Sequence, residues 1–226
     1  MLVMNYLADF LPLNNKTKRE ISDSYPNLFV PAAITFTIWG IIYLLLAFYC
    51  IIPFTWRYQF IISDISWLFA VSCILNSLWI LAWHYEKLPL SLLIMIGILV
   101  TLVYINIFIK ELPLGLIKAA FGIYLGWICI ATIANLTALL VYYKKNVFGT
   151  SDETWTIMMI VIATLIISLT LYKLDNPFIG VSVIWAFTGI ILKRWADYRS
   201  IVITAAVAVL IVGILTFWLF YLKMTG

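Results

Sequence analysis

The sequence has little charge and few of the side chains that catalytic and metal sites normally use. Charged residues make up 11% of its 226 residues, and it contains one histidine, His84, and three cysteines without CxxC spacing, Cys50, Cys73 and Cys129. One histidine cannot build a bis-histidine haem site or a multi-histidine metal site within a chain. Separated cysteines do not predict zinc. We therefore expect no metal site, with His84 as an interfacial side chain rather than a ligand contact.

Catalytic motifs and membrane-embedded charges are also missing. The sequence contains no GxSxG, no P-loop and no GxGxxG at a strand-to-helix turn. Its long apolar segments, as bounded below, carry no Asp, Glu, Lys or Arg, whereas proton-coupled pumps, voltage sensors and cation pores usually need one near the middle of the membrane. The sequence also lacks a basic patch interleaved with aromatic residues, which is the pattern that would indicate nucleic-acid binding. The sequence predicts no catalytic residue and disfavours ion transport.

Apolar sequence dominates instead, at 65% of residues. About 20 apolar residues in a helix cross the ~30 Å hydrocarbon core of a bilayer. Seven segments satisfy this length approximately, at residues 31–52, 65–84, 88–109, 119–143, 154–172, 176–192 and 200–222. Because lipid offers no partner to free backbone groups, each segment should be an α-helix. The predicted fold class is an all-α integral membrane protein, a polytopic helical bundle.

The N-terminal region differs from the rest of the chain. Residues 1–13 are too short to span and contain Asp9, so they predict a partial helix, which we expect a longer natural N-terminus to complete. They lack the features of a cleaved signal peptide. Residues 14–30 form a polar loop that contains proline. Nine lysines and arginines on the side of the 14–28 loop, against five on the other side, predict that this loop is cytoplasmic in a cell-membrane protein.

Aromatic and neutral polar residues recur at helical spacing in three of the segments. Positions i, i+3 and i+7 share one face of a helix. The three faces consist of Phe36, Trp39 and Tyr43; of Asn76, Trp79 and Trp83; and of Tyr124, Trp127 and Ala131, continued by Asn135. Trp39 and Trp127 are too central for an interfacial aromatic belt. Buried asparagines in a membrane need a partner, so these faces predict either contacts between helices or a shared aromatic pocket. Their alignment favours the pocket.

A pair of glycines lies on the opposite side of the third face. Gly122 and Gly126 form a GxxxG spacing, and small residues at this spacing allow another helix to approach closely. By helical angle they point away from Tyr124 and Trp127. This face should pack against a neighbouring helix or a second subunit.

The same segments resemble the TspO/MBR family of tryptophan-rich sensory or translocator proteins. The stretches FVPAAITFTIWGIIYLLLA, LNSLWILAW and IYLGWICIATIANL carry the resemblance, which covers roughly residues 13–145. Trp39 to Tyr43 match a Trp-Gly-x-x-Tyr motif, Asn76 and Trp79 match Asn-x-x-Trp, and Tyr124 to Asn135 match Tyr-x-x-Trp-x-x-x-Ala-Thr-x-x-Asn without a gap. One departure is that Trp83 and His84 stand where the family has paired aromatics.

The resemblance implies a five-helix core with its first helix truncated, capped by the 14–30 loop. Residues 1–145 would form this core and residues 146–226 a three-helix C-terminal membrane extension without a counterpart. The implied ligand is a tetrapyrrole such as protoporphyrin IX or haem, in some members a sterol, held without covalent attachment. Family members are often homodimers. The implied ligand-binding residues are Pro31, Phe36, Trp39, Tyr43, Asn76, Trp79, Trp83, Tyr124, Trp127, Ala131 and Asn135.

Two classes of function follow. The first is a membrane receptor, sensor or carrier for a planar hydrophobic ligand. The second is an integral assembly or accessory protein in which the same faces are helix contacts only. Light-dependent porphyrin breakdown is implied only weakly. A sterol-recognition pattern at Leu139, Tyr142 and Lys144 matches by chance too often to support a sterol.

Overall fold

The structure, a computed structural model, describes residues 1–226 except 2–3, 5–19, 22–23, 52–58, 144–149 and 226. Its main elements are a 3-10 helix, η2 (Ala33–Thr37), and the α-helices α3 (Ile38–Ile51), α4 (Gln59–His84), α5 (Leu88–Phe108), α6 (Leu116–Tyr142), α7 (Asp152–Leu174), α8 (Phe178–Arg194) and α9 (Arg199–Thr225). The predicted all-helical class is confirmed. Most of the predicted partial helix 1–13, and residues 14–19 of the predicted loop, lie outside the described residues.

Each predicted span corresponds to a helix, but the helices differ in length. Six helical segments are long and apolar enough to cross a membrane: Ala33–Ile51, Ser63–His84, Leu88–Phe108, Leu116–Tyr142, Asp152–Leu174 and Arg199–Thr225. The segment predicted at 176–192 is α8, which has 17 residues. At about 1.5 Å per residue such a helix is roughly 25 Å long, shorter than a ~30 Å hydrocarbon core. The prediction of seven full spans therefore holds for six.

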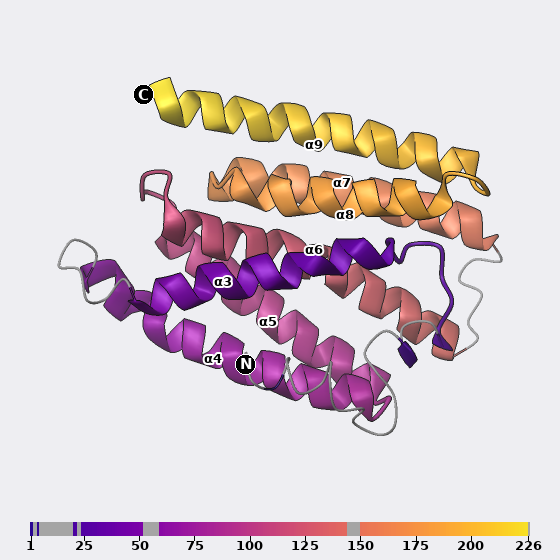
Figure 1. The fold of residues 1–226 in the computed structure, drawn as a ribbon, viewed down its shortest axis with the longest axis horizontal. Coiled ribbons are helices and arrows are strands. Elements are labelled where there is room, and N and C mark those ends of the chain that lie inside the picture. Colours follow the sequence, from indigo (N-terminus) through magenta and orange to yellow (C-terminus); the bar gives the residue numbers. More distant parts are fainter. Residues whose placement is uncertain (2–3, 5–19, 22–23, 52–58, 144–149, 226) are drawn as a thin grey trace.

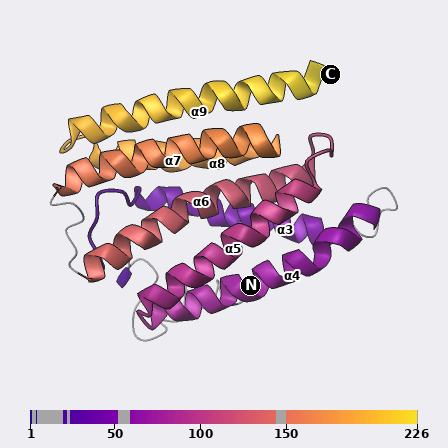
Figure 2. The same ribbon diagram turned by 180° about the vertical axis from the view of Figure 1, so that it is seen from behind.

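The helices lie in layers, with α6 in the middle (Figures 1 and 2). α9 runs along one edge, α7 and α8 lie between α9 and α6, and α4 lies at the opposite edge beyond α3 and α5. α6 packs against α5, α8 and α3, and more lightly against α7. All residues from Ala120 to Ile130 are buried. The polar and aromatic residues of this stretch consequently face protein rather than lipid.

Local signals end the helices where the chain turns. α7 begins after Ser151, whose hydroxyl accepts a hydrogen bond from the Thr154 N–H, as an N-cap residue should. It ends at Asp175, which adopts a left-handed conformation with φ 51°. Glu86, between α4 and α5, has φ 52°. Both turns are short, so α5 packs beside α4 and α8 beside α7.

One charged residue just outside a predicted span is buried inside the bundle. α6 begins at Leu116, so Lys118 lies in its first turn, where its side chain is completely buried. Its ammonium Nζ donates a hydrogen bond to the Asp175 carbonyl oxygen over 3.1 Å, and the Asp175 carboxylate forms an ion pair with Lys223 over 2.6 Å. The predicted span began at residue 119, whereas the helix begins three residues earlier and so includes Lys118, whose long side chain finds a polar partner from inside the helix.

Two asparagines complete this group. Asn176 donates to the Asn106 Oδ1 over 2.8 Å and to the Lys118 carbonyl over 3.0 Å, and Asn106 donates to the Phe121 carbonyl over 3.2 Å. The polar node, as we call Asn106, Lys118, Asp175, Asn176 and Lys223, thereby connects α5, α6, the turn between α7 and α8, and α9. It holds the C-terminal helices against the rest of the bundle at one end.

Candidate ligand-binding site

The predicted aromatic faces of α3 and α6 meet each other. The ring of Trp39 stacks on that of Tyr43, with centroids 5.4 Å apart and an interplanar angle of 25°. The Trp39 ring also makes edge-to-face contacts, with its centroid 6.1 Å from that of Tyr124 and 6.2 Å from that of Trp127. The Phe36 ring makes a similar contact with Trp127, with centroids 5.8 Å apart. We call these five residues the aromatic cluster. The helical spacing of the sequence correctly placed them on facing surfaces.

Asn76 brings α4 to the same place. Its side chain is completely buried, and its Nδ2 donates a hydrogen bond to the Tyr124 hydroxyl over 3.1 Å. The Tyr124 hydroxyl also lies 3.9 Å from the sulfur of Met1. The predicted need of Asn76 for a protein partner or cavity is thus met by a tyrosine of the cluster.

The remaining predicted residues gather toward one end of the bundle. Trp79 stacks near Trp83 with centroids 6.0 Å apart, and Trp83 is buried in a small hydrophobic group with Ile21, Tyr25, Leu88 and Ala138. Asn135 is buried and donates to the Ser91 hydroxyl over 2.7 Å. Ala131, partly buried, lies on the α6 face between Trp127 and Asn135.

Pro31 and His84 lie differently from the other predicted residues. Pro31 is buried beside Gly189 of α8, where a Cβ on the glycine would press against the proline ring. His84 lies at the end of α4, where it was predicted as an interfacial side chain, and it is completely buried with its Nδ1 2.8 Å from the Ile80 carbonyl oxygen. A backbone carbonyl one turn earlier in the same helix thus contacts the buried imidazole.

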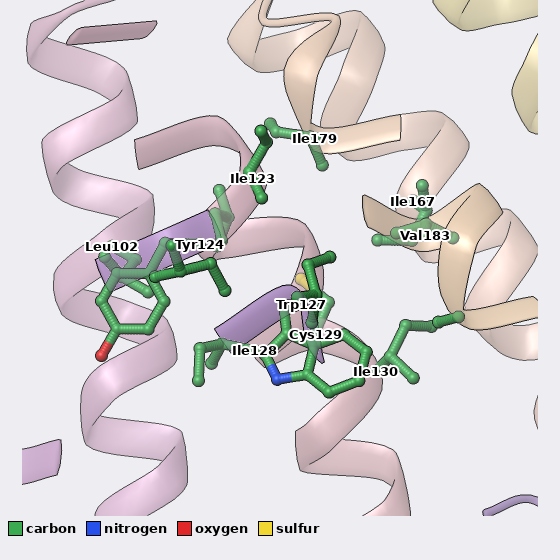
Figure 3. Close-up of a cluster of buried hydrophobic side chains, with 14 of the residues drawn as sticks. Leu102, Ile123, Tyr124, Trp127, Ile128, Cys129, Ile130, Ile167, Ile179 and Val183 are labelled. Atoms are coloured by element: carbon green, nitrogen blue, oxygen red, sulfur yellow. The ribbon is translucent and has the colours of Figure 1, made fainter. Parts of the chain in front are cut away.

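The GxxxG face of α6 packs against α8 of the same chain. A Cβ at Gly122 would overlap Asn176 and Phe178, and one at Gly126 would overlap the Ile179 carbonyl and the Ser182 hydroxyl. In Figure 3, Tyr124 and Leu102 lie on one side of α6, while Ile179, Ile167 and Val183 lie on the other. Of the two partners the spacing allowed, a neighbouring helix is the one that occupies this face.

Comparison with known proteins assigns the family. The chain matches the family described as TSPO-like protein over residues 1–218. It belongs to the TSPO-like protein family. The match includes α7, α8 and most of α9, and so extends beyond the segment 13–145 that carries the motifs. No curated protein and no solved structure matches this TSPO-like chain.

Three buried polar atoms in this TSPO-like site have no hydrogen-bond partner within the described part of the chain. They are the indole Nε1 atoms of Trp79 and Trp127 and the side-chain Oδ1 of Asn135. A buried polar atom without a partner costs about 1–3 kcal/mol. Two N–H donors and one acceptor oxygen are therefore able to receive polar groups of a bound molecule at little further desolvation cost.

Two hollows in the described structure lie away from the aromatic cluster. An apolar groove of about 450 Å³ runs along α9 and is lined by Ile184, Val209, Leu210, Gly213, Ile214, Phe217 and Trp218. A hollow of about 300 Å³ is lined by Pro26, Asn27, Leu28, Val30, Asp152, Lys193 and Arg194. The rings of the cluster contact one another directly, so a ligand there would replace ring contacts.

Sequence reasoning missed the residues that fasten the chain in front of α3. The hydrogen bonds of this region join Tyr25 to Glu86, Arg194 to the Leu28 carbonyl and Trp185 to the Thr35 carbonyl. Arg194 gave a signal only as one of the basic residues that set topology, and Trp185 only as a tryptophan in the middle of a segment. Neither spacing nor composition indicates a partner more than a hundred residues away.

Proposed function

We propose that this protein is a membrane receptor, sensor or carrier whose aromatic cluster binds a planar hydrophobic ligand. The observation that carries the proposal is the meeting of Trp39, Tyr43, Tyr124 and Trp127 from two helices at one uncharged place inside the bundle. Membership of the TSPO-like family supports a membrane protein of the ligand-binding or sensor class.

A tetrapyrrole is the ligand class that fits these groups best. The near-parallel rings of Trp39 and Tyr43 offer the geometry in which a flat macrocycle stacks. Each good aromatic contact contributes about 0.5–1.5 kcal/mol beyond the area it buries, so ligand stacking offsets the ring contacts it replaces. The indole N–H groups of Trp79 and Trp127 suit the acceptors of such a ligand, and the Asn135 oxygen suits a pyrrole N–H. A sterol has no aromatic face and gains less from this arrangement.

Residues outside the cluster complete the proposed site. Pro31 would fix the approach to α3, Asn76 would orient the Tyr124 hydroxyl, and Trp83 would form the rim together with Trp79. The ligand would be held without a covalent bond. The 14–28 loop would face the cytoplasm, and a homodimer would need a surface other than Gly122 and Gly126, since α8 covers them.

Titration with protoporphyrin IX tests this function. The protein, purified in detergent, is titrated while tryptophan fluorescence is followed, and cholesterol is titrated in parallel. We expect saturable quenching by protoporphyrin IX, because Trp39 and Trp127 would contact the ring, and none by cholesterol. Linear, non-saturating quenching equal to that of free tryptophan would refute the proposal.

The second candidate is an integral assembly or accessory protein. It is favoured by the bonds that already join the polar residues across helices, namely Asn76 to Tyr124 and Asn135 to Ser91. In that case the aromatic cluster is a helix contact only, and the same titration shows no binding.

A further inference from the structure

Residues 24–30, which we call the strap, are fastened at their start to the turn between α4 and α5. The Tyr25 hydroxyl donates to the Glu86 carboxylate over 2.5 Å, and the Tyr25 ring lies 6.1 Å from that of Tyr142 at the end of α6. Tyr25 is buried in the group that contains Trp83. The strap therefore closes the end of the bundle toward which Trp79, Trp83 and Asn135 lie.

The other end of the strap is fastened to α8. Arg194 donates from Nε to the Leu28 carbonyl over 3.1 Å and from Nη2 to the Asn27 carbonyl over 3.0 Å. Inside the strap, Asn27 donates to the Tyr25 carbonyl over 3.0 Å and accepts from the Val30 N–H over 3.2 Å. One guanidinium consequently holds two adjacent carbonyls of a turn that is already organised by its own asparagine.

α8 also holds the chain between the strap and the aromatic cluster. The Ala32 N–H donates to the Gly189 carbonyl over 3.0 Å, and the Trp185 indole N–H donates to the Thr35 carbonyl over 2.8 Å. Phe36, which follows directly, contacts Trp127. The strap and the chain that leads to Phe36 are thus both held on α8, which fixes the entrance of the chain into the aromatic cluster.

We propose that Arg194 is a positioning residue for ligand binding, which holds the strap closed over the Trp79, Trp83 and Asn135 end of the proposed ligand-binding site and limits the rate of ligand exchange. This gives α8, which lies outside the segment that carries the motifs, a role in controlling access. The inference rests on the proposed function, because it needs a ligand in the aromatic site.

The choice of arginine follows from geometry. Its planar guanidinium presents N–H donors in a fixed fork, whereas lysine is a single point of charge on a flexible stem. Hydrogen bonds from a charged donor are stronger than neutral ones. The hollow of about 300 Å³ beside Arg194 is bounded by the strap on one side and by Asp152 and Lys193 on the other. It leaves the strap space to move once the guanidinium is removed.

The anchoring is tested first without ligand, by hydrogen exchange of the full-length protein in detergent. Arg194→Gln is compared with Arg194→Lys and with Arg199→Gln, which removes an exposed arginine at the start of α9. The hydrogen-bonded amide of Val30 reports on the strap, and that of Ala32 reports on the chain directly after it. Losing two charge-assisted bonds should speed their exchange about tenfold or more in Arg194→Gln. The increase should be smaller in Arg194→Lys and absent in Arg199→Gln.

The gating is tested by stopped-flow mixing of the same variants with protoporphyrin IX. Arg194→Gln should raise the association and dissociation rates together, about tenfold, while the dissociation constant changes less than about threefold. Unchanged amide exchange would show that Arg194 does not anchor the strap. Faster amide exchange with unchanged ligand rates would show that the strap does not limit ligand exchange. A weaker affinity with an unchanged association rate and a lower unfolding temperature would show a structural role only. If the wild-type protein binds no porphyrin, the proposed function fails, and the role of the strap in ligand exchange fails with it. Amide exchange then still shows whether Arg194 anchors the strap.

Discussion

Gly126 shows how one position joins the two halves of the chain. A methyl group there would overlap the Ile179 carbonyl oxygen and the Ser182 hydroxyl of α8. We predict that Gly126→Ala destabilises the protein by about 1–3 kcal/mol, because the backbone of α8 must shift to make room. Thermal unfolding in detergent measures this loss.

Gly213→Ala is the matched control for this change. Gly213 also lies inside a long helix, but a Cβ there meets nothing within 4 Å. Removing a glycine from a helix interior usually gains about 0.5–1 kcal/mol, so the control should keep or raise the stability. Equal unfolding temperatures for the two variants would contradict the close contact between α6 and α8.

Asn176 is the residue on which the polar node depends most. Its side chain is completely buried, donates to Asn106 and Lys118, and accepts from the Phe178 N–H. Asn176→Leu should cost at least about 2 kcal/mol, because it leaves several buried polar groups without a partner at about 1–3 kcal/mol each. Chemical unfolding measures the loss, and a stability equal to that of the wild type would show that water or other groups replace the asparagine.

At the residue scale, the periodicity of the sequence predicted on which face of a helix a residue lies better than it predicted which element packs against that face. It correctly placed Gly122 and Gly126 opposite Tyr124 and Trp127, because a helix fixes these angles locally. It could not name α8 as the helix on the glycine face, since any helix with a complementary surface satisfies a GxxxG spacing. Lys118 was missed because its partner is a backbone carbonyl 57 residues away.

At the scale of elements, the strap has a titratable anchor, Tyr25, outside the membrane spans. Burial raises the pKa of Tyr25 above its usual value, and the hydrogen bond to Glu86 raises it further. A raised pKa in the folded state means that folding favours the protonated phenol. Its contribution is complete below the ordinary tyrosine pKa of about 10 and is lost as the pH rises beyond that value.

We therefore predict an alkaline loss of stability that Tyr25→Phe reduces. In the wild type, the unfolding temperature should fall between about pH 10 and pH 11.5, as the unfolded chain ionises Tyr25 and the folded chain does not. Tyr25→Phe should be less stable at neutral pH, where it lacks the bond to Glu86, and should show a shallower fall above pH 10. Parallel curves for the two proteins would contradict the assignment of Tyr25 as a buried, bonded phenol.

α8 marks the limit of what length and hydropathy could predict about elements. Its composition correctly predicted a helix at 176–192, but its 17 residues leave it shorter than the six candidate spans. Its buried face contains Gly180, Ser182 and Gly189, which allow Thr216, α6 and Thr35 to approach. Contacts with four other elements, α6, α7, α9 and η2, rather than its own hydrophobicity, explain why it lies where it does.

For the whole molecule, one hydrophobic core includes residues from both predicted parts of the chain. Phe29, Ile42, Trp127, Ile167, Val183 and Val212 all belong to it. The sequence predicted the aromatic cluster because its members repeat at helical spacing on two segments. The polar node and the strap anchors could not be predicted, since they join single residues that lie far apart in the chain and repeat no pattern.

The most direct test of the central claim, that the aromatic cluster binds a planar ligand, is to compare protoporphyrin IX dissociation constants among three variants and the wild type. Ala131→Phe should weaken binding by overpacking, about 1–3 kcal/mol or roughly five- to more than a hundredfold. Trp127→Leu should remove a stacking contact and most of the quenching, while Trp67→Leu, which changes a side chain that is 62% exposed on α4, should change neither. With folding checked by gel filtration, equal affinities in all four proteins would contradict the claim, and the cluster would then be a contact between helices.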